Sequence, residues 1–201
     1  MPKLGPKEKV TALIQRKGVV RARELTREGV TREHLRRLLH RGQLQRIGVG
    51  LYALPDADIS EHRSLAEACS RMPRGVICLL SALRVHHLTT QNPFEVWVAI
   101  PHKAWRPKVE GSRLRLVHLS GQAMTSGVQE HNIDGVPVRV FSPAKTVADC
   151  FKFRNKIGLD VALEALRDYR KKYRGGMDDL WRFAKVCRVT AVMRPYLEAL
   201  A

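Results

Sequence analysis

The chain has 201 residues, enough for one domain of ordinary size or for a small domain joined to a larger one. Apolar residues make up 44% of it, which excludes a disordered chain, and no apolar run reaches the roughly 18 residues of a membrane span. The 36 Lys and Arg residues outnumber the 19 Asp and Glu residues, for a net charge of +17, so we expect a polyanionic partner, above all nucleic acid. No apolar run follows the first Met either, so the sequence predicts a cytoplasmic protein without a membrane partner.

The first 42 residues predict three helices. The first runs over Pro6–Lys17 on an apolar stripe, and the second over Ala22–Glu28. Thr31 is the expected N-cap of the third, because a Thr hydroxyl accepts a hydrogen bond from the first helical turn. This third helix is expected to end near Arg41–Gly42, where glycine favours termination.

A β-hairpin is expected directly after these helices. Leu44–Ile47 and Leu51–Leu54 flank a glycine-containing turn, and Pro55–Asp58 has the composition of a linker. Helix, helix, turn, helix and hairpin in this order form a winged helix-turn-helix. We therefore predict a winged helix-turn-helix domain over residues 1–56 and a second domain over residues 57–201.

The second domain mixes strands and helices. A helix is expected over Glu61–Met72, and Ser81 is expected to cap a further helix after the buried run Val76–Leu80. The expected strands are Glu95–Ile100, Leu114–Leu119, Val128–Ile133 and Val136–Phe141, with Asp134–Gly135 as a tight turn between the last two. The rest is expected to be helical, over Pro143–Arg154, Gly158–Tyr173, Met177–Val186 and Thr190–Leu200. The fold class is thus α+β, a winged helix-turn-helix followed by a mixed α/β domain with a helical C-terminus.

The third helix carries the expected recognition surface. Residues 1–54 hold 13 Lys and Arg residues against four Asp and Glu residues, about half of the net charge of the chain. A helix in the major groove needs long donors on its exposed face, since an Arg fork bridges the two acceptors of guanine, and it needs phosphate contacts at its flanks. The predicted DNA-binding residues are Arg21, Arg23, Arg27, Thr31, Arg32, Arg36, Arg37, His40, Arg41 and Arg46. The alternatives are a solvated basic face and a protein-binding module.

No residue pattern predicts catalysis, a cofactor or a metal. The cysteines at 69, 78, 150 and 187 lie apart and beside apolar residues, which is typical of buried, reduced thiols. His86 and His87, with His118 or Cys78, are a weak zinc candidate, because adjacent helical residues point to different faces. A nuclease of the restriction-endonuclease type needs an Asp and a Glu-x-Lys on neighbouring strands, and no predicted strand carries that lysine.

Several short segments resemble the AbiE-type antitoxins of type IV toxin–antitoxin systems. They are Gly18–Leu25, Gly29–Thr31, Leu38–Leu39 and Gly42–Pro55 in the first domain, and Ser81–Leu83, Leu88–Thr89 and Phe141–Phe151 in the second. The resemblance spans about residues 10–165 and its motifs are mostly structural.

This resemblance implies an autorepressor that binds inverted repeats in its own promoter as double-stranded DNA. It also implies that the protein counters a nucleotidyltransferase-like toxin, without requiring direct binding to it. The second domain would serve antitoxicity and cooperative DNA binding, so the chain is expected to be a monomer in solution or cooperative on DNA. Two other functions stay open: a generic winged-helix regulator whose second domain senses a ligand or dimerises, and an atypical nuclease.

Overall fold

The computed structural model describes residues 5–17, 19–48, 50–55, 63–104, 114–133 and 136–199. The chain forms two compact units, Met1–Pro73 with Asn132–Val138, and Arg74–His131 with Arg139–Ala201. The predicted domain boundary after residue 56 stays a prediction. Asp56–Asp58 of the predicted linker, Glu61 at the expected helix start, Val49 of the hairpin turn and the predicted Asp134–Gly135 turn lie outside the described residues.

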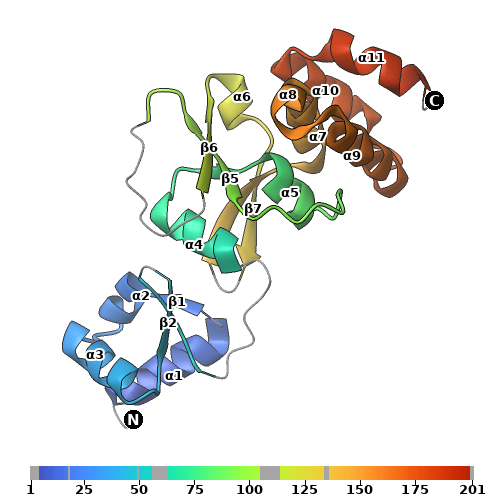
Figure 1. Ribbon diagram of the computed structural model, residues 1–201. Coiled ribbons are helices and arrows are strands. Elements are labelled where there is room, and N and C mark those ends of the chain that lie inside the picture. Colours follow the sequence, from blue (N-terminus) through green and yellow to red (C-terminus); the bar gives the residue numbers. More distant parts are fainter. Residues whose placement is uncertain are drawn as a thin grey trace. The chain divides into compact units, whose positions relative to one another are not determined.

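The first unit contains the predicted winged helix-turn-helix (Figure 1). Its elements are α1 (Pro6–Lys17), β1 (Val19–Arg21), α2 (Ala22–Arg27), α3 (Arg32–His40), β2 (Gln45–Gly48), β3 (Leu51–Ala53) and α4 (Arg63–Arg71). The strands form a three-stranded antiparallel sheet in the order β1-β3-β2. Strand β1 did not appear in the sequence prediction, because its three residues acquire strand geometry only by pairing with β3.

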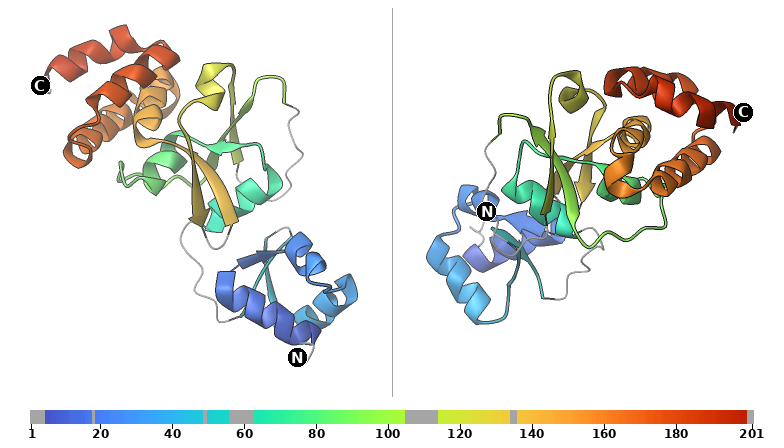
Figure 2. Two further views of the ribbon diagram at one scale, coloured as in Figure 1. Left: turned by 180° about the vertical axis from the view of Figure 1, so that it is seen from behind. Right: turned by 45° about the horizontal axis from the view of Figure 1, so that its top comes forward.

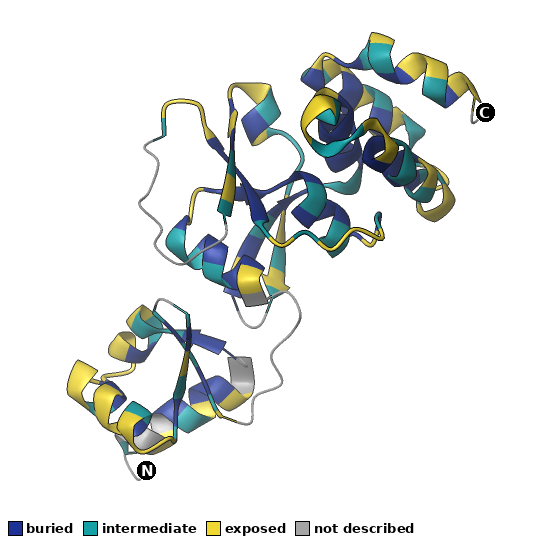
Figure 3. Cartoon of the chain, in the orientation of Figure 1, coloured by how far each residue is buried: buried dark blue, intermediate teal, exposed yellow. Residues whose placement is uncertain are grey.

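Aliphatic side chains from all three helices of the winged domain share one core. It consists of Val10, Leu13, Ile14, Val20, Leu25, Val30, Leu35, Leu38 and Leu44. On α3, Leu35 and Leu38 are buried, whereas the arginines of the same helix are exposed. Burying the apolar stripe therefore fixes which face of α3 meets solvent (Figure 3).

The second sheet is five-stranded and mixed, in the order β6-β5-β4-β8-β7. It lies in the second unit except for residues 132–133 and 136–138 of β7 and β8, which group with the first unit. The strands are β4 (Val76–Ile77), β5 (Val96–Pro101), β6 (Leu114–Leu119), β7 (Val128–Ile133) and β8 (Val136–Phe141). Strands β5 and β6 are parallel in the register Val98↔Leu116, while β4 is antiparallel to β5 and parallel to β8.

Helices gather at one end of this sheet (Figures 1 and 2). They are α7 (Pro143–Lys152), α8 (Arg154–Ile157), α9 (Leu159–Lys172), α10 (Met177–Cys187) and α11 (Thr190–Ala199), beside α5 (Leu79–Val85). The short α6 (Gln122–Thr125) follows β6. Helix α7 packs against α5, α9 and α10, and its residues 144–151 are all buried, so it is the centre of the core.

The structure corrects the predicted start of α5. Cys78, not Ser81, is its N-cap residue, and Ser81 is buried with its Oγ accepting the Trp97 N–H at 2.9 Å. The hydroxyl thus links the helix to β5 rather than capping it. The predicted burial of all four cysteines as free thiols is confirmed. No helix within the described ranges is long and apolar enough to cross a membrane.

Candidate nucleic-acid interface

Helix α3 begins where the sequence predicted. Thr31 is its N-cap, and its Oγ1 accepts the His34 backbone N–H at 3.3 Å and lies 2.7 Å from His34 Nδ1. Gly42 has a φ of +63° directly after the helix, a conformation that glycine adopts at little cost. The Thr31 cap and the turn at Gly42 therefore define where α3 begins and ends.

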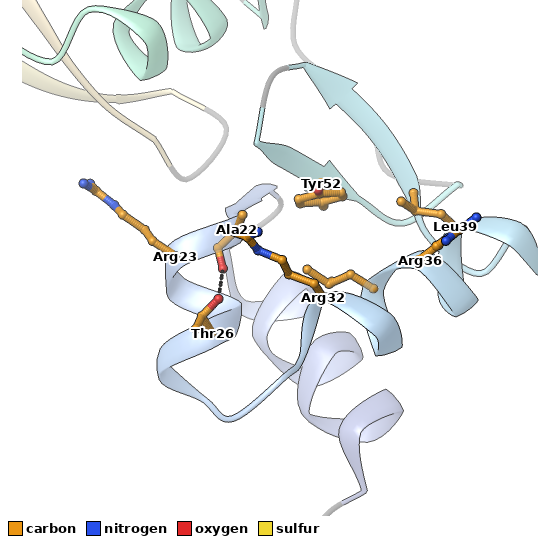
Figure 4. Close-up of a pocket in the computed structure, with 8 residues that line it drawn as sticks. Ala22, Arg23, Thr26, Arg32, Arg36, Leu39 and Tyr52 are labelled. Atoms are coloured by element: carbon orange, nitrogen blue, oxygen red, sulfur yellow. Dashed lines mark hydrogen bonds between the residues drawn. The ribbon is translucent and has the colours of Figure 1, made fainter.

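The exposed side of α3 borders a groove of about 610 Å³ (Figure 4). Its lining comes from α2, α3 and β3, and comprises Ala22, Arg23, Thr26, Arg32, Leu35, Arg36, Leu39 and Tyr52. Three of these eight side chains are arginines and none is acidic. The groove therefore combines positive charge with the apolar surface of Leu39 and Tyr52.

Three predicted residues lie together around this groove. Arg32 and Arg36 are one helical turn apart and both are exposed. Arg23 approaches from α2, and its guanidinium points away from the other two in Figure 4. None of the three forms an ion pair with another side chain in the described part of the chain. Their charges are thus available to an anionic partner.

The other predicted residues lie outside the groove lining. Arg27, His40 and Arg41 are exposed on the ends of α2 and α3. Arg37 pairs with Glu33 at 3.1 Å, and both side chains are more than half exposed, so water screens this pair. On β2, Arg46 Nε donates to the Gly48 carbonyl at 3.1 Å.

Arg21 differs from the rest of the predicted set because it is half-buried at the start of α2. Its backbone N–H donates to Glu24 Oε2 at 2.8 Å, and burial, followed by the charge of Arg23, lowers the pKa of its guanidinium. Part of the Arg21 side chain is therefore buried at the β1–α2 junction rather than fully exposed to solvent.

The sequence prediction missed Thr26 and Tyr52 as members of the same surface. Thr26 Oγ1 donates to the Ala22 carbonyl at 3.0 Å, and Tyr52 lies opposite Val20 and Arg46 in the sheet. Only the pairing of β3 between β1 and β2 brings Tyr52 beside α3. In the sequence, Tyr52 could have been noticed only as an aromatic residue within the predicted hairpin.

One family model matches the part of the chain that contains this groove. Residues 8–55 match the family model described as a transcriptional regulator, AbiEi antitoxin. These 48 residues are similar to the AbiEi antitoxin regulator domain. The matched residues run from α1 to the end of β3 and contain the complete groove, so the AbiEi regulator domain includes every predicted DNA-binding residue.

No curated protein matches the chain. Among solved structures, the chain is similar to that of the RV2827C protein from Mycobacterium tuberculosis, with a TM-score of 0.51 and 16% identity. The match covers 76% of this chain and 62% of that chain, so this chain spans less than two thirds of its neighbour's length. At this identity the likeness shows the fold alone. Because it covers most of the chain, the shared fold includes part of the second unit beyond the AbiEi domain.

Metal-ligating side chains do not cluster among the described residues of the second unit. No three His, Cys, Asp or Glu side chains lie close enough there to hold a metal ion. His86, a weak zinc candidate, is buried with its Nε2 2.7 Å from the Phe141 carbonyl, and His118 instead lies beside His102.

Proposed function

We propose that the protein is the antitoxin and transcriptional autorepressor of a type IV toxin–antitoxin operon. In this proposal the AbiEi domain binds inverted repeats in the promoter as double-stranded DNA. The observation that carries it is the groove beside α3, where Arg23, Arg32 and Arg36 surround an acid-free surface within an antitoxin-regulator domain. The proposed role is binding rather than catalysis. The proposed location is the cytoplasm, where the promoter lies.

The arginines have two proposed roles. Arg32 and Arg36 are proposed to read base edges, because they share the exposed face of the recognition helix and the bidentate Arg fork suits guanine. Arg23, Arg27, Arg37, His40, Arg41 and Arg46 are proposed to contact phosphates at the flanks, together with Thr31 and Arg21 at the helix starts. Each phosphate neutralised adds about 0.9 to the slope of log affinity against log salt.

An electrophoretic mobility-shift assay on the promoter of the protein's own operon tests the base-reading role. The double variant Arg32→Ala/Arg36→Ala should lose at least about thirtyfold in operator affinity, since each base contact is worth about 1–3 kcal/mol. It should also lose its preference for operator over unrelated DNA.

The matched control is Arg27→Ala/Arg41→Ala, which removes the same charge from exposed positions outside the groove. This control should weaken all DNA binding evenly and lower the salt slope by about 2, while the operator preference stays. An Arg32→Ala/Arg36→Ala protein that still prefers the operator would show that α3 is not the reading helix.

The antitoxin role concerns a nucleotidyltransferase-like toxin encoded beside this gene, which the protein need not bind directly. Co-expression should rescue growth from that toxin. We expect Arg32→Ala/Arg36→Ala to rescue as well, because neutralisation is proposed to reside in the second domain. Failure of the wild-type chain to rescue would refute the antitoxin role and leave the DNA-binding role standing.

A further inference from the structure

The second unit contains a basic recess that the proposed function does not use. It measures about 720 Å³ and lies where the end of β6, the start of α6 and the ends of α7 and α10 meet. Three exposed cations line it, Lys152, Lys185 and Arg188, together with the imidazole of His118. No Asp or Glu is among the residues that line it.

The cations of the recess are not engaged by neighbouring acids. Neither Lys152, Lys185 nor Arg188 forms an ion pair with a described residue. The charge of Lys152 acts on the carboxylate of Asp149, which is buried and already accepts hydrogen bonds from Lys145 Nζ and Cys187 Sγ. The positive charge therefore faces the recess without local neutralisation.

The partial negative charges at the helix ends offset only part of this positive charge. Lys152 and Lys185 lie in the last turns of α7 and α10, where exposed carbonyls favour a cation. Each helix end carries about half a negative charge, so two ends offset about one of the three full positive charges. The recess therefore keeps a positive charge, which favours an anionic group.

Arg188 occupies a position where the backbone favours glycine. Its φ and ψ are 57° and 45°, in the left-handed region, and the Val189 N–H donates to the Ala184 carbonyl at 2.9 Å in the usual helix-ending pattern. An arginine is disfavoured there relative to glycine, yet its long cation lines the recess. The residue that ends α10 thus also contributes a cation to the recess.

The recess also offers apolar surface and a suitable size. The half-buried side chains of Phe153 and Val186 line it beside the cations. Its volume falls within the range of about 300–1,000 Å³ that small-molecule sites occupy. We propose that this recess binds the phosphate group of a small phosphorylated ligand of nucleotide size, with Lys152, Lys185 and Arg188 as the phosphate contacts. The proposal is independent of the DNA-binding role.

Isothermal titration of the full chain with two probes, inorganic pyrophosphate and AMP, tests this site. Wild type should bind at least one of them with one site per chain. The double variant Lys185→Gln/Arg188→Gly should weaken that binding by at least about a hundredfold, since a hydrogen bond to a charged group is worth roughly a factor of ten or more. The glycine suits the left-handed backbone, so the fold is expected to survive.

Two controls remove two charges elsewhere. Arg167→Gln/Arg174→Gln changes exposed positions within α9 and after its end, and Arg32→Ala/Arg36→Ala changes the groove beside α3. Both should bind the probe within about twofold of wild type. Equal losses of affinity in all three variants would show that only the net charge of the chain matters, and would overturn the proposal. The absence of binding by both probes at millimolar concentration would overturn it as well. If only unrelated duplex DNA binding depends on Lys185 and Arg188, the recess is a nucleic-acid surface and the small-ligand proposal is wrong.

Discussion

Acidification should destabilise the second unit through His86. This histidine is 6% exposed at the end of α5, and its Nε2 lies 2.7 Å from the Phe141 carbonyl. The carbonyl can only accept, so the neutral ring carries its proton on Nε2. Burial is the largest influence and lowers the pKa of His86 from 6.5 to about 4. The hydrogen bond to Phe141 opposes this shift, and the charges of His131, Lys172 and His87 add to it.

Whether acid lowers or raises the stability depends on which state, folded or unfolded, binds the proton at the higher pH. The unfolded chain takes up the proton near pH 6.5, whereas the folded chain resists it until about pH 4. Stability from neutral His86 is therefore complete above pH 6.5 and is lost as the pH falls from 6.5 to 4. A difference of about 2.5 pKa units corresponds to about 3 kcal/mol, of which about 2 kcal/mol is lost by pH 5.

Urea unfolding between pH 7 and pH 4 measures this loss. Every tryptophan lies beyond residue 96, so their fluorescence follows the second unit. His86→Gln keeps an amide N–H for the Phe141 carbonyl but cannot gain a proton. Carboxylates titrate in both proteins, so the difference between them isolates His86. The free energy of unfolding of wild type should fall by about 3 kcal/mol more than that of His86→Gln.

Parallel pH profiles for the two proteins would refute this reasoning. A direct NMR titration of the His86 ring in the wild type provides the same test without a variant. A folded-state pKa near 6.5 would contradict the burial argument, whereas a value near 4 agrees with it.

Two further predictions concern α7 and the loop before β7. Lys145→Met should cost about 3–5 kcal/mol in urea unfolding, because Asp149 is left buried without its cation, while exposed Lys152→Met should change little; equal stabilities would contradict this. Gly127→Ala should cost about 1–3 kcal/mol more than Gly121→Ala, since both have positive φ but only at Gly127 would a Cβ meet Phe183, at 2.8 Å. Similar thermal midpoints for both glycine variants would contradict this, because they would show that Phe183 moves aside for the added methyl group at little cost.

Much of the fold follows from local sequence. The Thr31 cap, the spacing of Leu35 and Leu38, and the strands around residues 134–135 all appear where the sequence predicts them. Each depends on neighbours within a turn of helix or a hairpin, so local side-chain chemistry is enough to predict it. The exposed Arg32 and Arg36 follow as well, because burying the leucines turns the arginines outward.

Features that depend on contacts between residues far apart in the sequence are decided only by the tertiary structure. Strand β1 exists because β3 pairs with it, Ser81 leaves its expected capping role because β5 supplies the Trp97 N–H, and Tyr52 joins the α3 groove through the sheet. The recess of Lys152 and Lys185 needs β6, α7 and α10, which are far apart in the sequence. Periodicity and spacing carry no information on such contacts, because packing between elements rather than local preference creates them.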